Sequence, residues 1–126
     1  EQVQLLGTHT RNPLTPGRWR DRQEQLDAIA DWAQDQRGPA VVFGDLNVAP
    51  WSPSFDRLER DSGLVSSGAG RPTQATWPWF PSWLRPIGLP IDHLLHSPEL
   101  AVAERRVDPS LGSQHGVLVV ELGLAR

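Results

Sequence analysis

The sequence predicts a single α/β domain over residues 1–126. A strand, a helix and a second strand follow one another in the first 45 residues, and three more strand-like segments occur in the last third of the chain. This alternation of strand and helix patterns is typical of α/β layers. A chain of this length holds one hydrophobic core, and 38% hydrophobic and 21% charged residues are ordinary for a globular protein.

The first strand and the first helix are expected at Val3–Thr10 and Arg18–Gln36. The strand becomes polar at its last three residues, and a loop rich in Pro and Gly follows it. In the helix, charged residues fill one face, and the other face carries apolar residues at helical spacing, namely Leu26, Ile29, Ala30 and Ala33. We therefore expect an amphipathic helix that covers a flat layer and ends where Gly38 and Pro39 interrupt it.

The second strand, Ala40–Phe43, is a short continuous apolar run. This pattern predicts a strand that is buried on both faces. A short helix is expected after it, because Ser52 can cap a helix, Pro53 suits the first helical position and Gly63 can end it. The chain thus repeats the order of strand and helix.

The rest of the chain combines one long irregular segment with three strands. Residues 65–90 are rich in Gly, Ser and Pro, hold three of the six tryptophans in the motif TWPWFPSW, and allow at most one short strand. Loops of this length in compact domains are usually functional or mobile. The three strands are expected at residues 91–97, 101–109 and 116–124.

Charge and composition restrict the classes of function. The net charge of −3 provides no broad cationic field for nucleic acid, although a local basic rim is compatible with it. The absence of cysteine excludes a disulfide framework and a thiolate metal site, and leaves the redox compartment open. No apolar run approaches the roughly 20 residues of a membrane span, which indicates a soluble domain. Because Glu1 already begins a strand pattern, we expect a piece of a longer protein, whose upstream segments and localisation stay open.

Polar clusters stand at the ends of four apolar runs. In open α/β sheets, ligands bind at strand ends and the loops that follow, where the backbone is anchored on one side only. Asp45 and Asn47 are two residues apart, so both side chains would point to the same side of an extended chain. The four clusters are Thr8–Thr10, Gly44–Asn47, Ile91–His93 and Gly112–His115.

Each cluster also has a structural explanation. The Gly-Asp-Leu-Asn segment is typical of turns, His9 or His115 can be a hydrogen-bonded structural residue, and Asp92 can hold a loop in place. The tryptophans can pack the core and loops or form a base-stacking platform. The occurrence of all four clusters at strand ends favours a functional site over an unrelated α/β domain with polar strand ends.

The motifs GTHT, GDLNVAPWS, TWP, PIDHLLHS and GSQHGVLVVEL, in this order, resemble those of the endonuclease/exonuclease/phosphatase superfamily, the metal-dependent phosphoesterases related to deoxyribonuclease I. The resemblance runs from Val3 to Leu122. It implies a four-layer αββα sandwich, of which residues 1–126 would be the C-terminal half: one mixed β-sheet with helices on one face. The N-terminal half of the family domain is absent from this chain.

The resemblance also implies roles for individual residues. Asp45 would orient or deprotonate the attacking water, and Asn47 would donate to a phosphate oxygen or to the nucleophile. His115 would contact the phosphate, and Asp92 would accept its other ring proton. His9 would lie near the scissile phosphate or the leaving group.

A divalent cation, Mg²⁺ or Mn²⁺, is implied as cofactor, with Asp45 and position 114 at the metal. The family normally has Ser-Asp-His at the last motif, and here the middle residue is the neutral Gln114. The missing N-terminal half would supply an Asn and the main metal-binding Glu. These departures support a second hypothesis, a degenerate and catalytically weak member that acts as a binding or interaction module.

The family's substrates include nucleic acids, lipid headgroups and small phosphoesters, so specificity is expected in the loop of residues 66–90. Its candidates for substrate contact are Trp77, Trp79, Arg71 and Arg85. The half-domain also predicts a partner. A sheet whose inner face is apolar must be covered, by the missing N-terminal half or by a second copy of the chain.

Overall fold

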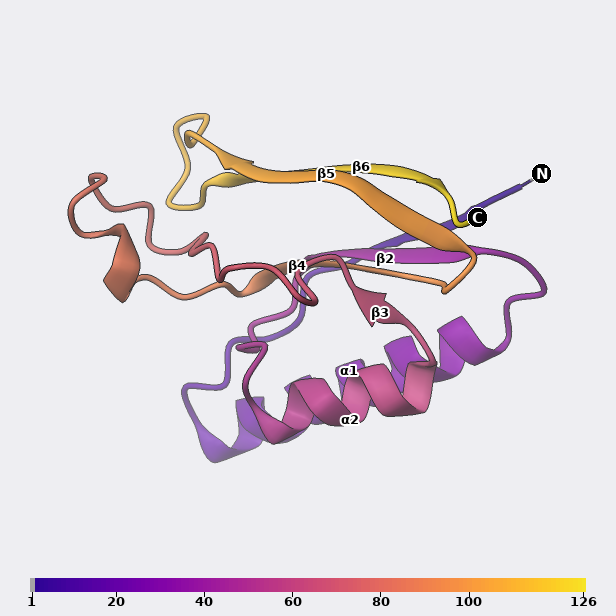
Figure 1. Ribbon diagram of the computed structural model, residues 1–126. Coiled ribbons are helices and arrows are strands. Elements are labelled where there is room, and N and C mark those ends of the chain that lie inside the picture. The colour runs from indigo at the N-terminus through magenta and orange to yellow at the C-terminus, as the bar shows by residue number, and fades with distance from the viewer. Residues whose placement is uncertain (1) are drawn as a thin grey trace.

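The computed structural model describes residues 2–126 and has six strands in two sheets, with two α-helices (Figure 1). The elements are β1 (Gln4–Gly7), α1 (Pro16–Gln34), β2 (Ala40–Asp45), α2 (Pro53–Ser62), β3 (Val65–Ser66), a short 3₁₀ turn (Arg85–Ile87), β4 (Asp92–His96), β5 (Leu100–Asp108) and β6 (Val117–Leu124).

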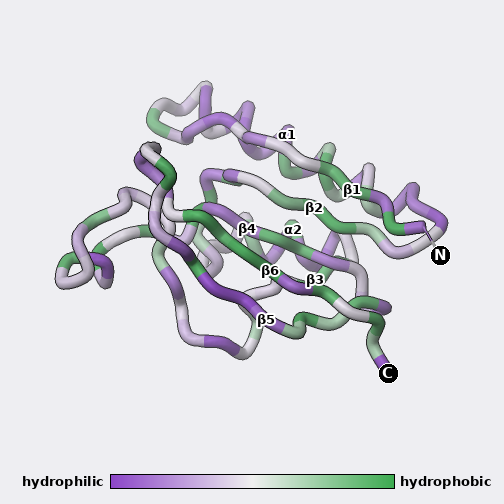
Figure 2. The backbone as a smooth tube through the Cα atoms, turned by 90° about the horizontal axis from the view of Figure 1, so that it is seen from above, coloured by the Kyte–Doolittle hydropathy of each residue, from purple (hydrophilic) through white to green (hydrophobic). Residues whose placement is uncertain are grey.

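The larger sheet is mixed and has the strand order β1-β2-β4-β3. β1 and β2 are parallel, whereas β4 is antiparallel to β2 and β3. Helices α1 and α2 lie on one face, which confirms the expected mixed sheet with helices on one side (Figure 1). β5 and β6 form a separate antiparallel hairpin that lies over the other face. Figure 2, seen from this side, shows that β6 is largely hydrophobic and that β5 has a hydrophilic middle.

The helix ends follow from local chemistry. The Ser52 hydroxyl accepts a hydrogen bond from the Phe55 amide at 3.3 Å, and Gly63 ends α2 with φ 72°. Both features were predicted, because a short polar side chain satisfies a free amide and glycine adopts positive φ without strain. α1 begins two residues earlier than predicted, at Pro16, because Thr15 caps it.

The core fills the space between the helices and the larger sheet, with Val42, Leu95 and Phe55 almost fully buried. The prediction that Ala40–Phe43 is buried on both faces is wrong at its last residue. Phe43 is 42% exposed, because it points to the face that β5 and β6 cover only in part.

One charged residue contradicts the predicted polar face of α1. Arg22 lies one helical turn before Leu26 on the apolar stripe and is only 7% exposed. Two of its guanidinium nitrogens donate to oxygens outside the helix, at Asn47 and Ser54. The helix therefore carries a buried cation into the region behind β2.

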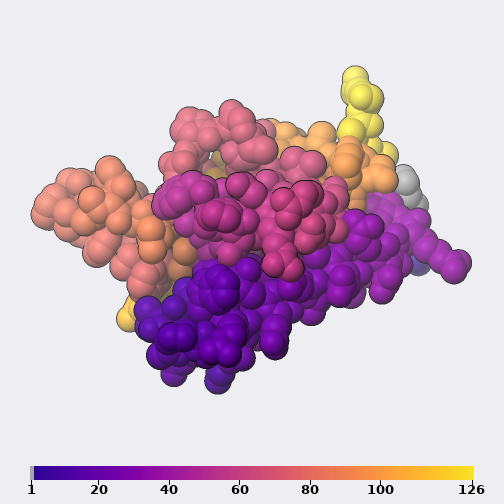
Figure 3. All heavy atoms as spheres, turned by 90° about the horizontal axis from the view of Figure 1, so that it is seen from below, coloured from indigo at the N-terminus to yellow at the C-terminus, as the bar shows by residue number. Residues whose placement is uncertain are grey.

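The long segment between β3 and β4 contains little regular structure, as expected. In the space-filling view from the helix side, its second half, salmon to orange, projects from the body, while α1 and α2 lie side by side (Figure 3). Within residues 2–126, no helix combines the length and the apolar character needed to cross a membrane.

Candidate active site

A pocket of about 650 Å³ opens where the chain leaves β1 and β2 and where it enters β4 and β6. The site residues predicted from the sequence that line it are His9, Asp45, Asn47, Trp77 and His115. They come from four segments that are far apart in the sequence. The sheet thus brings these polar strand ends together.

Asp45, at the end of β2, is the centre of this pocket. Its side chain is 15% exposed, and its Oδ1 accepts a hydrogen bond from the Asn47 amide at 2.9 Å. Its Oδ2 lies 3.4 Å from His9 Nε2 and 3.7 Å from His115 Nε2. The preceding Gly44 has φ 141°, and a Cβ there would lie 1.8 Å from the Thr8 carbonyl oxygen. Glycine is therefore required where β2 passes the end of β1.

Asn47 shares the pocket with Asp45, but the expectation of an extended chain between them is wrong. β2 ends at Asp45, and Asn47 has φ 46°, a left-handed conformation that Asn tolerates better than most residues. The chain turns here because the Asp45 carboxylate accepts the Asn47 amide. The Asn47 side-chain amide donates to the Thr10 carbonyl at 2.7 Å, which leaves its second proton available.

Asp92 and His115 form a hydrogen-bonded pair. Asp92 begins β4 and His115 precedes β6, and His115 Nδ1 donates to Asp92 Oδ2 at 2.7 Å. With the proton on Nδ1, the neutral ring presents a bare Nε2 toward Asp45. The Trp77 ring lies against the same imidazole, with 6.4 Å between ring centroids.

The electrostatics of the cluster favour a cation. Burial, and then the negative charge of Asp92, raise the pKa of Asp45 above its ordinary value, against the lowering effects of the Asn47 amide and the two histidines. Asp45, Asp92 and His115 each offer one ligand atom, and these atoms lie within 4.8 Å of one another. Two carboxylate oxygens and an imidazole nitrogen are donors that a divalent cation accepts, so the residues present fit a divalent metal ion without selecting which one.

The other predicted residues lie elsewhere. Gln114 is exposed, and its backbone carbonyl accepts a hydrogen bond from the Trp79 amide. Arg85 stacks on the Trp79 ring, 4.0 Å from its centroid, in a neighbouring pocket. Arg71 is at the rim of a third, smaller pocket. Of the four candidates for substrate contact, the structure brings only Trp77 into the pocket of Asp45.

Two residues, Arg22 and Thr10, hold Asn47 in a way that the sequence did not predict. Its backbone carbonyl accepts a hydrogen bond from Arg22 at 2.8 Å, and its side chain is bound by the carbonyl of Thr10. The signal for Arg22 was its position on the apolar stripe of α1, four residues before Leu26. A charge on a buried face requires a polar partner nearby, and here the partner is the loop that contains Asn47.

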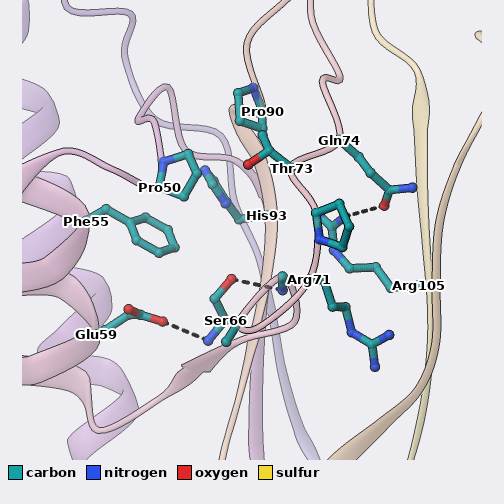
Figure 4. A pocket seen from close by; sticks show the side chains of 13 residues that line it. Pro50, Phe55, Glu59, Ser66, Arg71, Thr73, Gln74, Pro90, His93 and Arg105 are labelled. Carbon is teal, nitrogen blue, oxygen red and sulfur yellow. Dashed lines mark hydrogen bonds between the residues drawn. The ribbon is translucent and has the colours of Figure 1, made fainter. Parts of the chain in front are cut away.

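The third pocket, of about 170 Å³, is lined in part by His93, the residue that follows Asp92 in β4 (Figure 4). His93 points to α2, its ring centroid lies 4.6 Å from that of Phe55, and its Nε2 donates to the Val48 carbonyl at 2.6 Å. Burial lowers the pKa of His93 to about 4. Asp92 and His93 therefore point to different sites.

A sequence profile of the Endonuclease/Exonuclease/phosphatase family matches residues 4–115. No curated protein matches the chain. Similar solved structures include a mannosyl-6-phosphatase from Bacteroides thetaiotaomicron, with 20% identity and a TM-score of 0.64. The matched region covers 95% of this chain and 51% of the phosphatase chain. The human Nocturnin catalytic domain with a bound sulfate anion has 21% identity and a TM-score of 0.65. The matched region covers 94% of this chain and 46% of the Nocturnin chain.

A 3′-5′ exonuclease from Neisseria meningitidis has 21% identity and a TM-score of 0.67, with 93% of this chain and 60% of that chain covered. At these identities the likeness concerns the fold. The chain spans about half the length of the first structures that it matches, with 50%, 51% and 48% of their chains covered.

Proposed function

Because this chain belongs to the Endonuclease/Exonuclease/phosphatase family, we propose that its parent protein is a metal-dependent phosphoesterase whose site includes Asp45, Asn47 and His115. Members of the family hydrolyse phosphoester bonds. The observation that carries the proposal is the convergence of Asp45, Asp92 and His115 within 4.8 Å from three separate strand ends. Turn chemistry alone gives no reason for these three groups to meet.

We assign to Asp45 the role of base for the attacking water. Burial raises the pKa of Asp45, which makes its carboxylate a stronger base than an exposed one. Because Asp92 holds Nδ1 of His115, the Nε2 of this ring is directed into the pocket; in the imidazolium form it would donate to a phosphate oxygen, and in the neutral form it would bind the cation. Asn47 keeps one amide proton that can stabilise charge on the phosphoryl group. We assign to the exposed His9, 3.4 Å from Asp45, a role near the leaving group.

Asp45, Asp92 and His115 would hold the cation, together with groups from the missing half. When bound, Mg²⁺ or Mn²⁺ would polarise the phosphoryl oxygens. Position 114, which precedes His115 in the sequence, carries a neutral amide where the family's motif has an acid, so we expect weaker cation binding than with an acid at this position.

Hydrolysis of a generic phosphodiester by the full-length protein, with Mg²⁺ or Mn²⁺, tests the proposal. The wild type is expected to turn over, and Asp45→Ala and His115→Ala are expected to lose most of the rate. Equal rates in all three proteins would remove the assignment of these residues.

The second candidate function is a binding module that keeps the fold without efficient chemistry, and Gln114 is the observation that favours it. Gln114→Asp separates the two. A gain in metal affinity and turnover would indicate a weakened enzyme, whereas no change in either would favour the binding module.

We also propose that the missing half covers the open side of the larger sheet. A cavity of about 460 Å³ lies between the two sheets, lined in part by Phe43, Leu94, Leu118 and Val120. Apolar surface of this kind is normally covered in a stable protein. The isolated chain is expected to self-associate in size-exclusion chromatography. A monomer that stays well behaved at all concentrations would contradict this proposal.

A further inference from the structure

Arg22 is a buried cation on the apolar side of α1. It is only 7% exposed, and it lies one helical turn before Leu26, which is 3% exposed. Burial lowers the pKa of the Arg22 guanidinium, but an arginine keeps its charge in a folded protein. None of the ion pairs within residues 2–126 includes Arg22. A buried charge without an opposite charge is costly, so its position calls for an explanation beyond the packing of the helix.

The guanidinium of Arg22 joins three segments of the chain. Its Nη1 donates to the backbone carbonyl of Asn47 at 2.8 Å, and its Nη2 donates to Ser54 Oγ, in the first turn of α2, at 3.4 Å. The same Nη2 donates to Gln23 Oε1 at 3.3 Å, on α1 itself. Figure 1 shows α1 and α2 side by side on one face of the larger sheet. Arg22 therefore holds the loop after β2 against both helices.

Several unfavourable features gather around Asn47. Its φ of 46° is left-handed. Arg22 Nε and Thr10 Oγ1 are both buried, and neither has a hydrogen-bond partner within residues 2–126. Features of this kind cost free energy and persist where the surrounding structure enforces them, most often at functional sites. The fold thus holds residue 47 in one orientation at a cost in stability.

Two contacts fix the orientation of the Asn47 side chain. Arg22 holds its backbone carbonyl, and the carbonyl of Thr10 accepts one of its two side-chain protons at 2.7 Å. Asn47 lines the pocket together with Asp45 and His115. Once the backbone and the first proton are held, the direction of the second proton is set as well. A donor that is oriented before the substrate binds stabilises developing charge without reorganisation.

We propose that Arg22 is a positioning residue, which orients the remaining side-chain proton of Asn47 toward the phosphoryl group of the substrate. The inference rests on the function proposed above. Arg22 is not among the residues that line the pocket, so it acts through Asn47 and not by contact with the substrate. A purely structural Arg22 makes a different prediction: its loss lowers the free energy of unfolding but leaves turnover per folded molecule unchanged.

Turnover of a generic phosphodiester by the full-length protein, corrected for the folded fraction, separates the two roles. Arg22→Met fills much of the same space without the donors, and it is expected to lower kcat roughly tenfold or more with little change in KM, because the Asn47 proton acts in the transition state. Arg22→Lys keeps one donor for the Asn47 carbonyl and should give an intermediate kcat. Arg20→Met, at an exposed position of the same helix, is the control and should match the wild type.

A double-mutant cycle with Asn47→Gly tests whether Arg22 acts through Asn47. Glycine removes the side chain and tolerates the positive φ at this position. If Arg22 acts through the Asn47 side chain, Arg22→Met should lower kcat by less than about threefold once residue 47 is glycine. A further loss as large as in the wild-type background would show that Arg22 acts independently of Asn47, and would overturn the proposal.

A binding measurement separates this inference from the proposed function. The NMR signals of the Asn47 side-chain amide in the full-length protein are followed during titration with inorganic phosphate in the presence of Mg²⁺. They are expected to shift in the wild type and in Arg20→Met, and to shift less in Arg22→Met. This result without hydrolysis by the wild type would contradict the proposed function but not the positioning role. Hydrolysis by the wild type with an unchanged kcat in Arg22→Met, or equal shifts in all three proteins, would remove the positioning role and leave the proposed function standing.

Discussion

His115 and His93 occupy two neighbouring regions of the molecule and have opposite surroundings. His115 lies in the open pocket, with Asp92 on one ring nitrogen and Asp45 facing the other. His93 lies behind the sheet, next to Phe55 and under the Val48 carbonyl, with a pKa lowered to about 4 by burial. Asp92 and His93 are adjacent in β4, so their side chains point to opposite faces of the sheet.

This difference shows what makes a polar strand end functional. The residue type is the same, but one imidazole keeps a free nitrogen that faces an open pocket, while the other uses its nitrogen to satisfy a buried carbonyl. The first can contact a ligand in the pocket, and the second, with its pKa lowered to about 4, stays neutral near pH 7 and stabilises the fold. Substitutions on each side should therefore affect different measurements.

The largest effect is expected from Asp45→Asn, which keeps the shape of the side chain and removes its charge. The base and one cation ligand are lost together, so turnover by the full-length protein should fall by roughly 10²–10⁴-fold. The free energy of unfolding should change little or increase, because a buried carboxylate with a raised pKa is costly to ionise. Unchanged turnover would place the base elsewhere.

His93 should make stability depend on pH. An unfolded histidine binds a proton near pH 6.5, whereas folded His93 stays neutral down to about pH 4, so the unfolded state holds more protons between these values. Stability should fall as the pH decreases from 6.5 to 4, by roughly 3 kcal/mol at most, and should not depend on this group above that range. Urea unfolding at pH 7 and pH 4.5 measures the loss.

His93→Gln keeps a donor for the Val48 carbonyl and removes the titration. The variant should therefore lose less stability than the wild type between the two pH values, while the contribution of the carboxylates is common to both proteins. Identical losses would show that His93 does not titrate as its burial predicts.

A smaller effect on turnover is expected from Asp92→Asn. The substitution leaves His115 without a charged partner on Nδ1, and substitutions of such partners typically reduce activity or metal affinity by roughly 10–100-fold. Asp108→Asn, which removes an exposed ion pair with Arg106, is the matched control and should leave turnover unchanged. Equal turnover for both variants would mean that Asp92 does not support His115.

The smallest effect is expected from Ser52→Ala, which removes the cap of α2. The Phe55 amide would lose its side-chain acceptor and keep only the Ser52 carbonyl; loss of such a cap destabilises a protein by about 1 kcal/mol, measured as a lower urea midpoint. Ser82→Ala in an exposed loop serves as the control. The rate of hydrolysis by folded protein should not change, because Ser52 contacts no residue of the site cluster.

The sequence predicted the elements well because their signals are local. Ser52, Pro53 and Gly63 each act within one helical turn, and the polar residues that meet at the site all follow or precede apolar runs. The separate hairpin of β5 and β6 was not foreseen, because pairing between distant strands leaves no local signal.

The site was predicted in composition but not in geometry. Asp45 and Asn47 meet through a turn and not through an extended strand, since the carboxylate binds the Asn47 amide. The burial of Arg22 was missed because a charged side chain on a helix is usually assigned to solvent, and only the packing of α1 against the loop of Asn47 shows its partner.

The most direct test makes the same substitution at both histidines. His115→Gln and His93→Gln are compared in hydrolysis of a generic phosphodiester with Mn²⁺ by the full-length protein, each rate corrected for the folded fraction. We predict that His115→Gln loses roughly 100-fold or more, as is typical for a group that acts on the reacting phosphate, and that His93→Gln stays near the wild type. Equal losses, or a larger loss at His93, would contradict the assignment of the active site to the pocket of Asp45 and His115.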